Sequence, residues 1–200
     1  MVRLILVGYR ASGKTTIAEA VARYLKCPVV DADVVFEQKY ECTVGTFIQD
    51  RGEASFRDAE TSVLRELLQV SDAVLSTGGG VILREENRLM IRDAGIPVVW
   101  VSASAKEIRR RLALDETTAS RRPALQGKDV YSEVEQALAD REMYYDEVAC
   151  KRIDTDGKTV AAIVEIVLKW LFTYDKSSSP SDDLSCLLYT SPSPRDNSGS

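Results

Sequence analysis

The sequence predicts a three-layer α/β/α sandwich built around a mostly parallel, five-stranded sheet. Short apolar runs recur along the chain, and segments with the helical spacing of apolar residues separate them. The first run is unbroken and ends in a glycine-rich loop that leads into an amphipathic segment. Strands that alternate with helices in this way are typical of βαβ units, in which helices cover both faces of a parallel sheet.

Five segments are expected to form the strands. The first, 4–7, reads Leu-Ile-Leu-Val and has no polar position, as expected for a strand buried on both faces. The other strands are expected at 29–30, 73–75, 97–101 and, with weaker apolar character, 151–154.

The segments between these strands have the apolar periodicity of helices. In 14–26, Ile17, Val21 and Leu25 fall on one face. Further helices are expected at 32–40, 53–70, 85–94, 105–113, 131–148 and 159–170.

Two segments do not fit the alternation. Residues 114–128 lack apolar periodicity and contain Thr-Thr, Arg-Arg-Pro and Gly, which predicts a long exposed loop. From 175 onward the composition shifts to Ser, Pro and Asp, which predicts disorder. Within this tail, 186–196 (CLLYTSPSPRD) resembles the translation of a sequencing adapter. We therefore expect one domain over 1–174 and a different natural C-terminus.

The composition is that of a soluble globular protein, with 44% apolar and 28% charged residues. The chain has no histidine, which excludes Ser-His-Asp and Cys-His nucleophile chemistry and His-based zinc or haem sites. The net charge of -5 disfavours a role in binding nucleic acids or anionic membranes. The four cysteines form no C-x-x-C pair, and no segment has the pattern of a signal peptide or a membrane span. A cytoplasmic protein is expected.

A phosphate-binding loop is predicted directly after the first strand. Residues 8–15, GYRASGKT, match G-x-x-x-x-G-K-[ST] between a strand and a helix, the context that the motif requires. Backbone N–H groups of such a loop bind phosphates, its lysine bridges the β- and γ-phosphates, and its threonine can ligate Mg2+. The residues expected to bind the nucleotide are Gly8, Ala11, Ser12, Gly13, Lys14, Thr15 and Thr16.

Polar and glycine residues follow two further strands. Asp31 and Asp33 come directly after the second strand, where α/β sheets bind ligands. One carboxylate can hold Mg2+ through water and the other can accept a hydrogen bond from a substrate hydroxyl, although a simple helix cap also fits. The three glycines at 78–80 follow the third strand and are typical of a close backbone approach to a ligand, or of a plain turn. Arg57 by itself is compatible with a solvated helix face.

Two classes of nucleotide-dependent protein are disfavoured. GTPases read guanine with N-K-x-D, and the only asparagines, Asn87 and Asn197, do not lie in that setting. Protein-kinase catalytic loops need His-Arg-Asp, which this chain cannot supply. A small-molecule kinase that uses ATP and Mg2+ remains.

Taken together, these residues resemble the shikimate kinase family, P-loop enzymes with a nucleoside monophosphate kinase-like fold that phosphorylate the 3-hydroxyl of shikimate. The resemblance extends over about 2–171. Its motifs are GYRASGKT, D-A-D at 31–33, G-E-x-x-F-R at 52–57, GGG at 78–80, Arg122-Pro123, and R-x-x-Y-Y-x-E-V-A at 141–149.

The resemblance implies roles for particular residues. Shikimate would be held by Asp33, Arg57, Gly79, Gly80 and Arg141. Lys14, Asp33 and Arg122 would be catalytic, with Asp33 orienting the acceptor hydroxyl and standing as candidate general base, and Arg122 reaching the transferring phosphoryl group from a closing lid.

For the nucleotide, the resemblance implies that Arg110 and Arg152 flank adenine and that Arg122 also contacts the phosphates. Asp31 would hold Mg2+ through water beside Thr15.

Two other functions fit part of the pattern. A gluconate-type kinase shares the nucleotide half of the site and is distinguished by Asp33, Arg57, the three glycines and Arg141. A non-catalytic nucleotide-binding module would keep the phosphate loop without turnover. The expected partner is shikimate alone, on the route to chorismate and the aromatic amino acids, and a monomer is expected.

Overall fold

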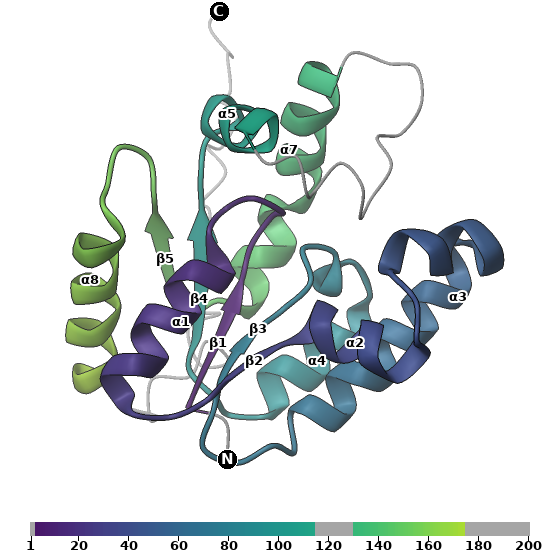
Figure 1. Cartoon of the computed structure of the whole chain (residues 1–200). Coiled ribbons are helices and arrows are strands. Elements are labelled where there is room, and N and C mark those ends of the chain that lie inside the picture. The colour runs from purple at the N-terminus through teal and green to yellow at the C-terminus, as the bar shows by residue number, and fades with distance from the viewer. Residues whose placement is uncertain (1–2, 115–129, 175–200) are drawn as a thin grey trace, which may run out of the picture.

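The structure, a computed structural model, describes residues 3–114 and 130–174. It contains a five-stranded sheet with the order β2-β3-β1-β4-β5, and every strand pair is parallel. The strands are β1 (Leu4–Val7), β2 (Val29–Asp31), β3 (Val74–Ser76), β4 (Val98–Ser102) and β5 (Lys151–Asp154). Helices lie on both faces of the sheet, which confirms the predicted three-layer fold (Figure 1).

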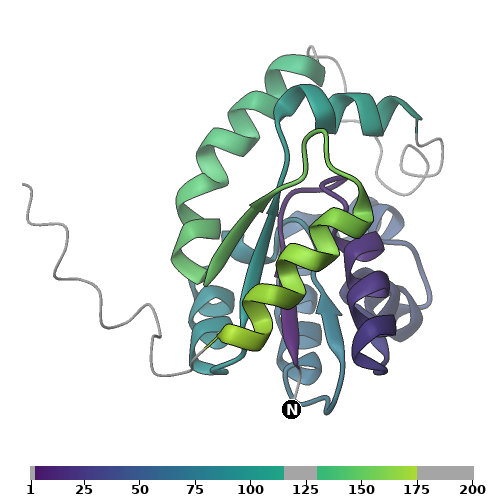
Figure 2. The ribbon, with the colours of Figure 1, turned by 90° about the vertical axis from the view of Figure 1, so that its left-hand side faces the viewer.

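The helices divide between the two faces of the sheet. One face is covered by α1 (Lys14–Leu25) and α8 (Val160–Thr173), which lie side by side in both ribbon views (Figures 1 and 2). The other face carries α3 (Val44–Leu67), α4 (Glu85–Asp93) and α7 (Val130–Val148). The remaining elements are α2 (Ala32–Tyr40), the 3-10 turn η1 (Val81–Leu83) and α5 (Ala105–Leu114).

Strand β1 separates two hydrophobic cores. Ile5 and Val7 pack into the core formed with α3, α4 and α7, whereas Leu4 and Leu6 pack into the core formed with α1 and α8. All four side chains are 0% exposed. An unbroken apolar run is what a central parallel strand requires, because side chains alternate between its two buried faces.

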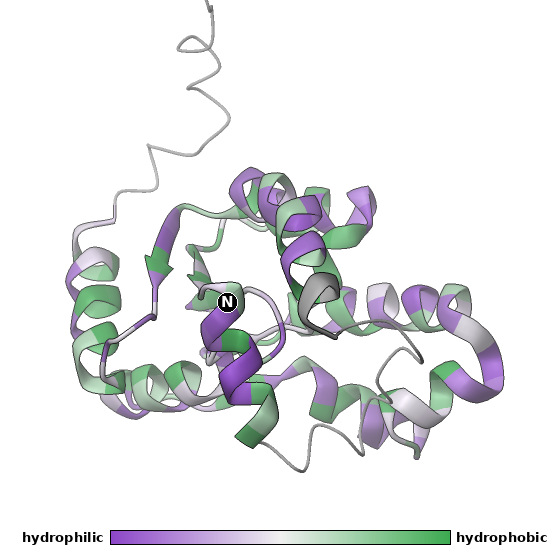
Figure 3. Ribbon diagram, turned by 90° about the horizontal axis from the view of Figure 1, so that it is seen from above, coloured by the Kyte–Doolittle hydropathy of each residue, from purple (hydrophilic) through white to green (hydrophobic). Residues whose placement is uncertain are grey.

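Helix α8 is apolar along most of its length, as its hydropathy colouring shows (Figure 3). Ile163, Val167 and Leu168 are buried against the sheet, and Phe172 is exposed. In the described part of the chain, no helix has the length and apolarity needed to cross a membrane.

Helix α3 begins at Val44 rather than at 53 as expected. Gly52, at φ 80, interrupts the helical backbone, and the helix expected from the sequence starts directly after this kink. The Thr43 side chain caps the first half by accepting a hydrogen bond from the Thr46 N–H at 3.1 Å. The first half also has a buried side, which includes Phe47.

The other element boundaries agree with the prediction to within a few residues, and strands β2, β3 and β4 each end one residue later than expected. Leu114, the first residue of the predicted loop, closes α5. The rest of that loop, including Arg122, lies outside the described residues, as do the tail at 175–200 and its adapter-like segment.

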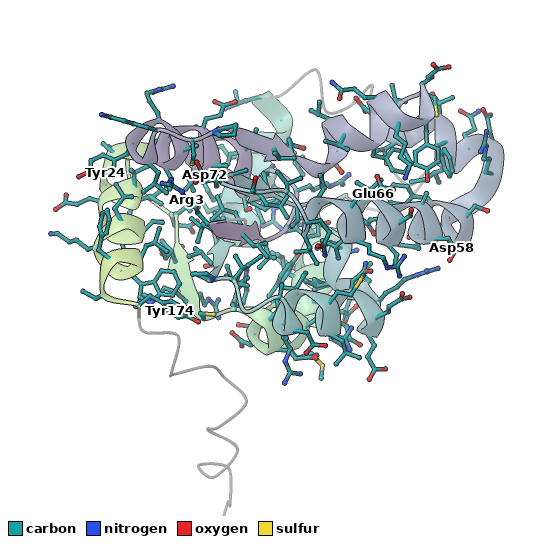
Figure 4. The ribbon with its side chains drawn as sticks, turned by 90° about the horizontal axis from the view of Figure 1, so that it is seen from below. Arg3, Tyr24, Asp58, Glu66, Asp72 and Tyr174 are labelled. Atoms are coloured by element: carbon teal, nitrogen blue, oxygen red, sulfur yellow. The ribbon has the colours of Figure 1, made fainter. Side chains whose placement is uncertain are left out.

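The amino-terminal and carboxyl-terminal ends of the strands carry different groups. At the amino-terminal edge Arg3 forms an ion pair with Asp72 and donates to the Leu25 carbonyl at 3.1 Å, and Figure 4 shows Arg3 and Asp72 together on this underside. The carboxyl edge carries the phosphate loop, the Asp-Ala-Asp segment and the three glycines. These are the loops where a parallel sheet presents ligand-binding groups.

Candidate active site

The loop 8–13 joins β1 to α1 and has the backbone of a phosphate-binding loop. Gly13 adopts φ 101, and at Gly8 a Cβ atom would lie 2.3 Å from the Val101 carbonyl oxygen. A side chain at Gly8 is therefore excluded by strand β4. Lys14 is buried, with 8% of the residue exposed. Its Nζ donates to the Tyr9 carbonyl at 2.9 Å and so lies across the loop.

Thr15 and Asp31 meet at the start of α1. The Thr15 hydroxyl donates to Asp31 Oδ2 at 2.8 Å and lies 3.4 Å from the Ser76 hydroxyl. Asp31 Oδ1 accepts from the Asp33 N–H at 3.0 Å, so the same carboxylate also caps α2. The helix-cap and metal-site interpretations are thus compatible, since each uses a different oxygen. A cavity of about 590 Å³ opens beside Thr15, Asp31 and Asp33.

The three glycines at 78–80 bring several polar groups close together. A Cβ on Gly78 would lie 3.0 Å from both Asp33 Oδ1 and Glu60 Oε1, and one on Gly80 would lie 2.4 Å from Arg57 Nη1. On Gly79 a Cβ would lie 2.9 Å from the backbone nitrogen of Arg10 in the phosphate loop. The turn therefore packs between α2, α3 and the phosphate loop, and no side chain fits in it.

Arg57 is held in place by carboxylates of its own helix. Its Nη1 donates to Glu60 Oε2 at 2.7 Å and its Nη2 to Glu53 Oε1 at 3.0 Å. The side chain is 15% exposed, which differs from the solvated surface charge that its helix position alone allowed. Burial disfavours the charged guanidinium, yet Glu60 and Glu53 raise the pKa of Arg57 above its ordinary value.

Arg141 approaches the same region from α7. Its guanidinium carbon lies 5.2 Å from the centre of the Tyr9 ring.

One helical turn later, the Tyr145 hydroxyl donates to the Gly79 carbonyl at 2.8 Å, and its ring stacks on Trp100 with centroids 5.3 Å apart. Burial raises the pKa of Tyr145 well above its usual value, so this hydroxyl keeps its proton and remains a donor. Tyr145 belongs to the motif at 141–149 without a predicted role, because its hydrogen-bond partner is a backbone atom of a distant segment.

Replacing Tyr145 with phenylalanine removes the buried hydrogen bond to Gly79 and keeps the aromatic stack. We expect a loss of about 1 kcal/mol in unfolding free energy, together with a rise of about fivefold in KM for the acceptor as the glycine turn loosens. Thermal unfolding and steady-state kinetics measure the two effects. The matched control is Tyr144→Phe, since the neighbouring Tyr144 is stacked under Arg88 and has no bond to the turn. Equal behaviour of the two variants would contradict the prediction.

The arginines predicted to flank adenine lie in different surroundings. Arg110 is 60% exposed and pairs with Glu107 at 2.7 Å. Hydrogen bonds from Arg110, and then from Arg111, lower the pKa of Glu107 to about 2 against the effect of its burial. Arg152 pairs with Glu142 at 2.6 Å and stacks over Trp100 at 4.0 Å. Their roles toward the nucleotide stay predictions.

Arg111, which sequence reasoning passed over, is the arginine of this run that contacts the phosphate loop. Its Nη1 donates to the Ser12 carbonyl at 2.8 Å and to the Ala11 carbonyl at 3.3 Å. Its Nη2 donates to Thr155 Oγ1 at 3.2 Å, and Thr155 also lies against the Ser12 carbonyl. The only available signal was the run of three arginines at 109–111, and the register of α5 decides which of them faces the loop.

The phosphate loop, the helix-capping Asp31 and the Arg57 guanidinium beside the glycine turn lie at the carboxyl ends of the strands of a sheet with the order 2-3-1-4-5. This arrangement defines a P-loop small-molecule kinase with the nucleoside monophosphate kinase-like fold. The family model for shikimate kinase matches residues 10–172. The chain belongs to the shikimate kinase family and is an ATP-dependent phosphotransferase.

Relatives and solved structures agree with this assignment. The chain is 39% identical over 166 residues to the shikimate kinase of Rhodopirellula baltica, covering 83% of this chain and 88% of the relative. It is 33% identical over 180 residues to that of Thioalkalivibrio sulfidiphilus, covering 90% and 92%. The structure of the Acinetobacter baumannii shikimate kinase in complex with shikimate matches with a TM-score of 0.79 and 28% identity, over 86% of this chain and 94% of the other. A gluconokinase from Sinorhizobium meliloti, at 15% identity and a TM-score of 0.56, shares the fold alone.

Proposed function

We propose that this chain transfers the γ-phosphoryl group of ATP to the 3-hydroxyl of shikimate, giving ADP and shikimate 3-phosphate. The observation that carries this proposal is the glycine turn at 78–80, which joins Asp33 and Arg57 to the phosphate loop within one compact site. An acceptor bound there would have its hydroxyl next to the phosphates.

At the nucleotide end, backbone N–H groups of Gly8, Ala11, Ser12 and Gly13 and residues Thr15 and Thr16 would bind the phosphates. Lys14 would leave the Tyr9 carbonyl and bridge the β- and γ-phosphates, where its charge offsets the charge that builds up during transfer. Arg122 of the lid is proposed to reach the same phosphoryl group, and closure of the lid would exclude water.

The residues present fit a magnesium ion. Thr15 and Asp31 contribute a hydroxyl and a carboxylate within 2.8 Å of each other, and such oxygen ligands, completed by waters and substrate phosphates, are those that Mg2+ prefers. When bound, the ion neutralises charge on the phosphate oxygens. Asp31 would act through a water molecule and Thr15 directly.

At the acceptor end, the carboxylate of shikimate would pair with Arg57 and Arg141. A guanidinium forms charge-assisted, often bidentate bonds with a carboxylate, and Glu53 and Glu60 hold that of Arg57 in one orientation. The missing side chains of Gly79 and Gly80 let Arg57 and the phosphate loop lie directly against the turn, beside the proposed position of the substrate. Asp33 would accept a hydrogen bond from the attacking hydroxyl, orient it in line with the γ-phosphate and take its proton.

We also propose that Arg111 positions the phosphate loop for the nucleotide. Replacing Arg111 with glutamine should raise KM for ATP by about fivefold to tenfold, because hydrogen bonds to the Ala11 and Ser12 carbonyls are lost. Arg110→Gln, tested in parallel, removes a charge from the same helix and the same Glu107 partner. A larger rise in KM for ATP from Arg110→Gln would contradict this assignment and favour the sequence-based one.

The reaction is tested by measuring ADP release from the purified full chain with Mg-ATP, offering shikimate and gluconate in parallel. Release with shikimate alone is the expected result, with shikimate 3-phosphate identified as the product by mass spectrometry. Release with gluconate alone would overturn the roles of Asp33, Arg57 and Arg141. No release with either acceptor, together with ATP binding, would indicate a non-catalytic module.

We further propose that the enzyme works as a monomer in the reducing cytoplasm. Cys27, Cys42 and Cys150 are free in the structure, which fits a reducing compartment. Sedimentation at assay concentration tests the oligomeric state, for which a single species of about 22 kDa is expected.

A further inference from the structure

Arg10 lies in the phosphate loop beside the glycine turn, and the roles proposed above do not include it. Its backbone nitrogen lies 2.9 Å from where a Cβ of Gly79 would be. Its guanidinium carbon lies 6.0 Å from the centre of the Tyr9 ring, and the guanidinium carbon of Arg141 lies 5.2 Å from the same centre. Arg10 and Arg141 therefore approach one aromatic ring from two different elements of the chain.

The side chain of Arg10 has a buried donor that the described residues leave without an acceptor. Arg10 is half-buried, and its Nε is buried without a hydrogen-bond partner. Arg57 and Arg111 differ in this respect, because Arg57 pairs with two carboxylates and Arg111 donates to two carbonyls. A buried charged donor without an acceptor lowers stability, and such a group is retained where a ligand supplies the acceptor.

The charges nearby indicate that this ligand is an anion. The guanidinium of Arg57 abuts Gly80, and the backbone of Arg10 abuts Gly79. The guanidinium groups of Arg10 and Arg141 share the Tyr9 ring. Arg57 has its own carboxylate partners, so a bound anion would relieve chiefly the charge of Arg10 and Arg141.

The position of Arg10 favours the acceptor over the nucleotide as the source of the anion. Thr15, which is proposed to hold the metal, lies in the first turn of α1 and faces Asp31, and the Lys14 Nζ donates to the Tyr9 carbonyl. The guanidinium of Arg10 lies instead beside the Tyr9 ring, which it shares with Arg141, a residue proposed to bind the acceptor.

We propose that Arg10 is a substrate-binding residue that donates to the carboxylate of the acceptor, as a third cation beside Arg57 and Arg141. This inference rests on the proposed function, and it adds a specificity-determining residue to that site. Arg10 then favours acceptors that carry a carboxylate on the ring and disfavours neutral cyclic polyols, for which a buried charge would remain without a partner.

The test compares the wild type with Arg10→Gln, which removes the charge and keeps a polar side chain of moderate length. We expect KM for shikimate, and its Kd measured calorimetrically without ATP, to rise about tenfold or more, the effect of losing a charge-assisted hydrogen bond. KM for ATP should change less than about twofold. Arg10→Lys should recover part of the affinity, because it restores the charge without the planar fork.

The methyl ester of shikimate identifies the atoms involved. If Arg10 pairs with the carboxylate, the ratio of kcat/KM between wild type and Arg10→Gln should fall from about tenfold with shikimate to near unity with the ester. Arg23→Gln is the matched control, since Arg23 is an exposed arginine on α1. It should leave all constants unchanged.

An unchanged affinity of Arg10→Gln for shikimate would overturn the proposal, as would an effect confined to ATP or an equal effect with acid and ester. Retained ATP binding by Arg10→Gln would show that the phosphate loop has folded. Loss of both ATP binding and shikimate binding would also count against a role of Arg10 specific to the acceptor. If the wild-type chain itself fails to bind shikimate, the proposed function fails as well, so the two failures are distinguishable.

Discussion

Replacing Lys14 with methionine is expected to lower kcat by about a thousandfold or more. The ammonium group is the fixed positive charge that would bridge the β- and γ-phosphates, and the transfer proceeds mainly through positioning and charge neutralisation. Methionine keeps most of the aliphatic volume but has no donor. The bond from Lys14 to the Tyr9 carbonyl is also lost, which should cost about 1 kcal/mol of stability. Turnover is measured as shikimate-dependent ADP release at saturating ATP and shikimate.

The control for this variant is Lys106→Met, which removes an exposed lysine from α5. It should keep wild-type turnover. Circular dichroism and thermal unfolding must show that Lys14→Met is folded. A folded Lys14→Met enzyme that retains more than about a tenth of the wild-type kcat would contradict the role of Lys14 in phosphoryl transfer.

The sequence predicts the sheet and most helices because their signals are local. The run at 4–7 has no polar residue, which suits a strand buried on both faces, and the helices that alternate with the strands favour a parallel sheet. The first half of α3 was missed for an equally local reason. Gly52 breaks the helical backbone at φ 80, and although Val44, Phe47 and Ile48 before it have helical spacing, they cover little more than one turn.

The candidate site was predictable to the extent that motifs fix their own geometry. The phosphate loop brings Lys14 and Thr15 to their positions by its spacing alone. The partners that hold the other groups are non-local or depend on the register of a helix. Tyr145 bonds to a carbonyl 66 residues away, and α5 turns Arg111 toward the phosphate loop while Arg110 stays largely exposed. The sequence shows the tyrosine pair and the run of arginines, but it does not show which member of each makes the contact.

Replacing Arg57 with alanine is expected to raise KM and Kd for shikimate by about a hundredfold, with a much smaller change in KM for ATP. The variant removes one of the guanidinium groups proposed to pair with the substrate carboxylate, and hydrogen bonds between charged groups are the strong ones. Arg57→Lys should recover only part of the affinity, because an ammonium group cannot supply the fork that reaches Glu53 and Glu60 at once. The constants come from calorimetry with shikimate and from steady-state kinetics with each substrate varied.

Arg65→Ala is the matched control for Arg57→Ala. Arg65 lies on the same helix α3 and also pairs with a glutamate, Glu86, but it is 58% exposed. A surface ion pair of this kind contributes little, so this variant should bind shikimate as the wild type does. If Arg57→Ala instead binds shikimate as tightly as Arg65→Ala, the acceptor cannot lie against the glycine turn. The pairing of Arg57 with Glu60 would then serve only to fix α3 against that turn.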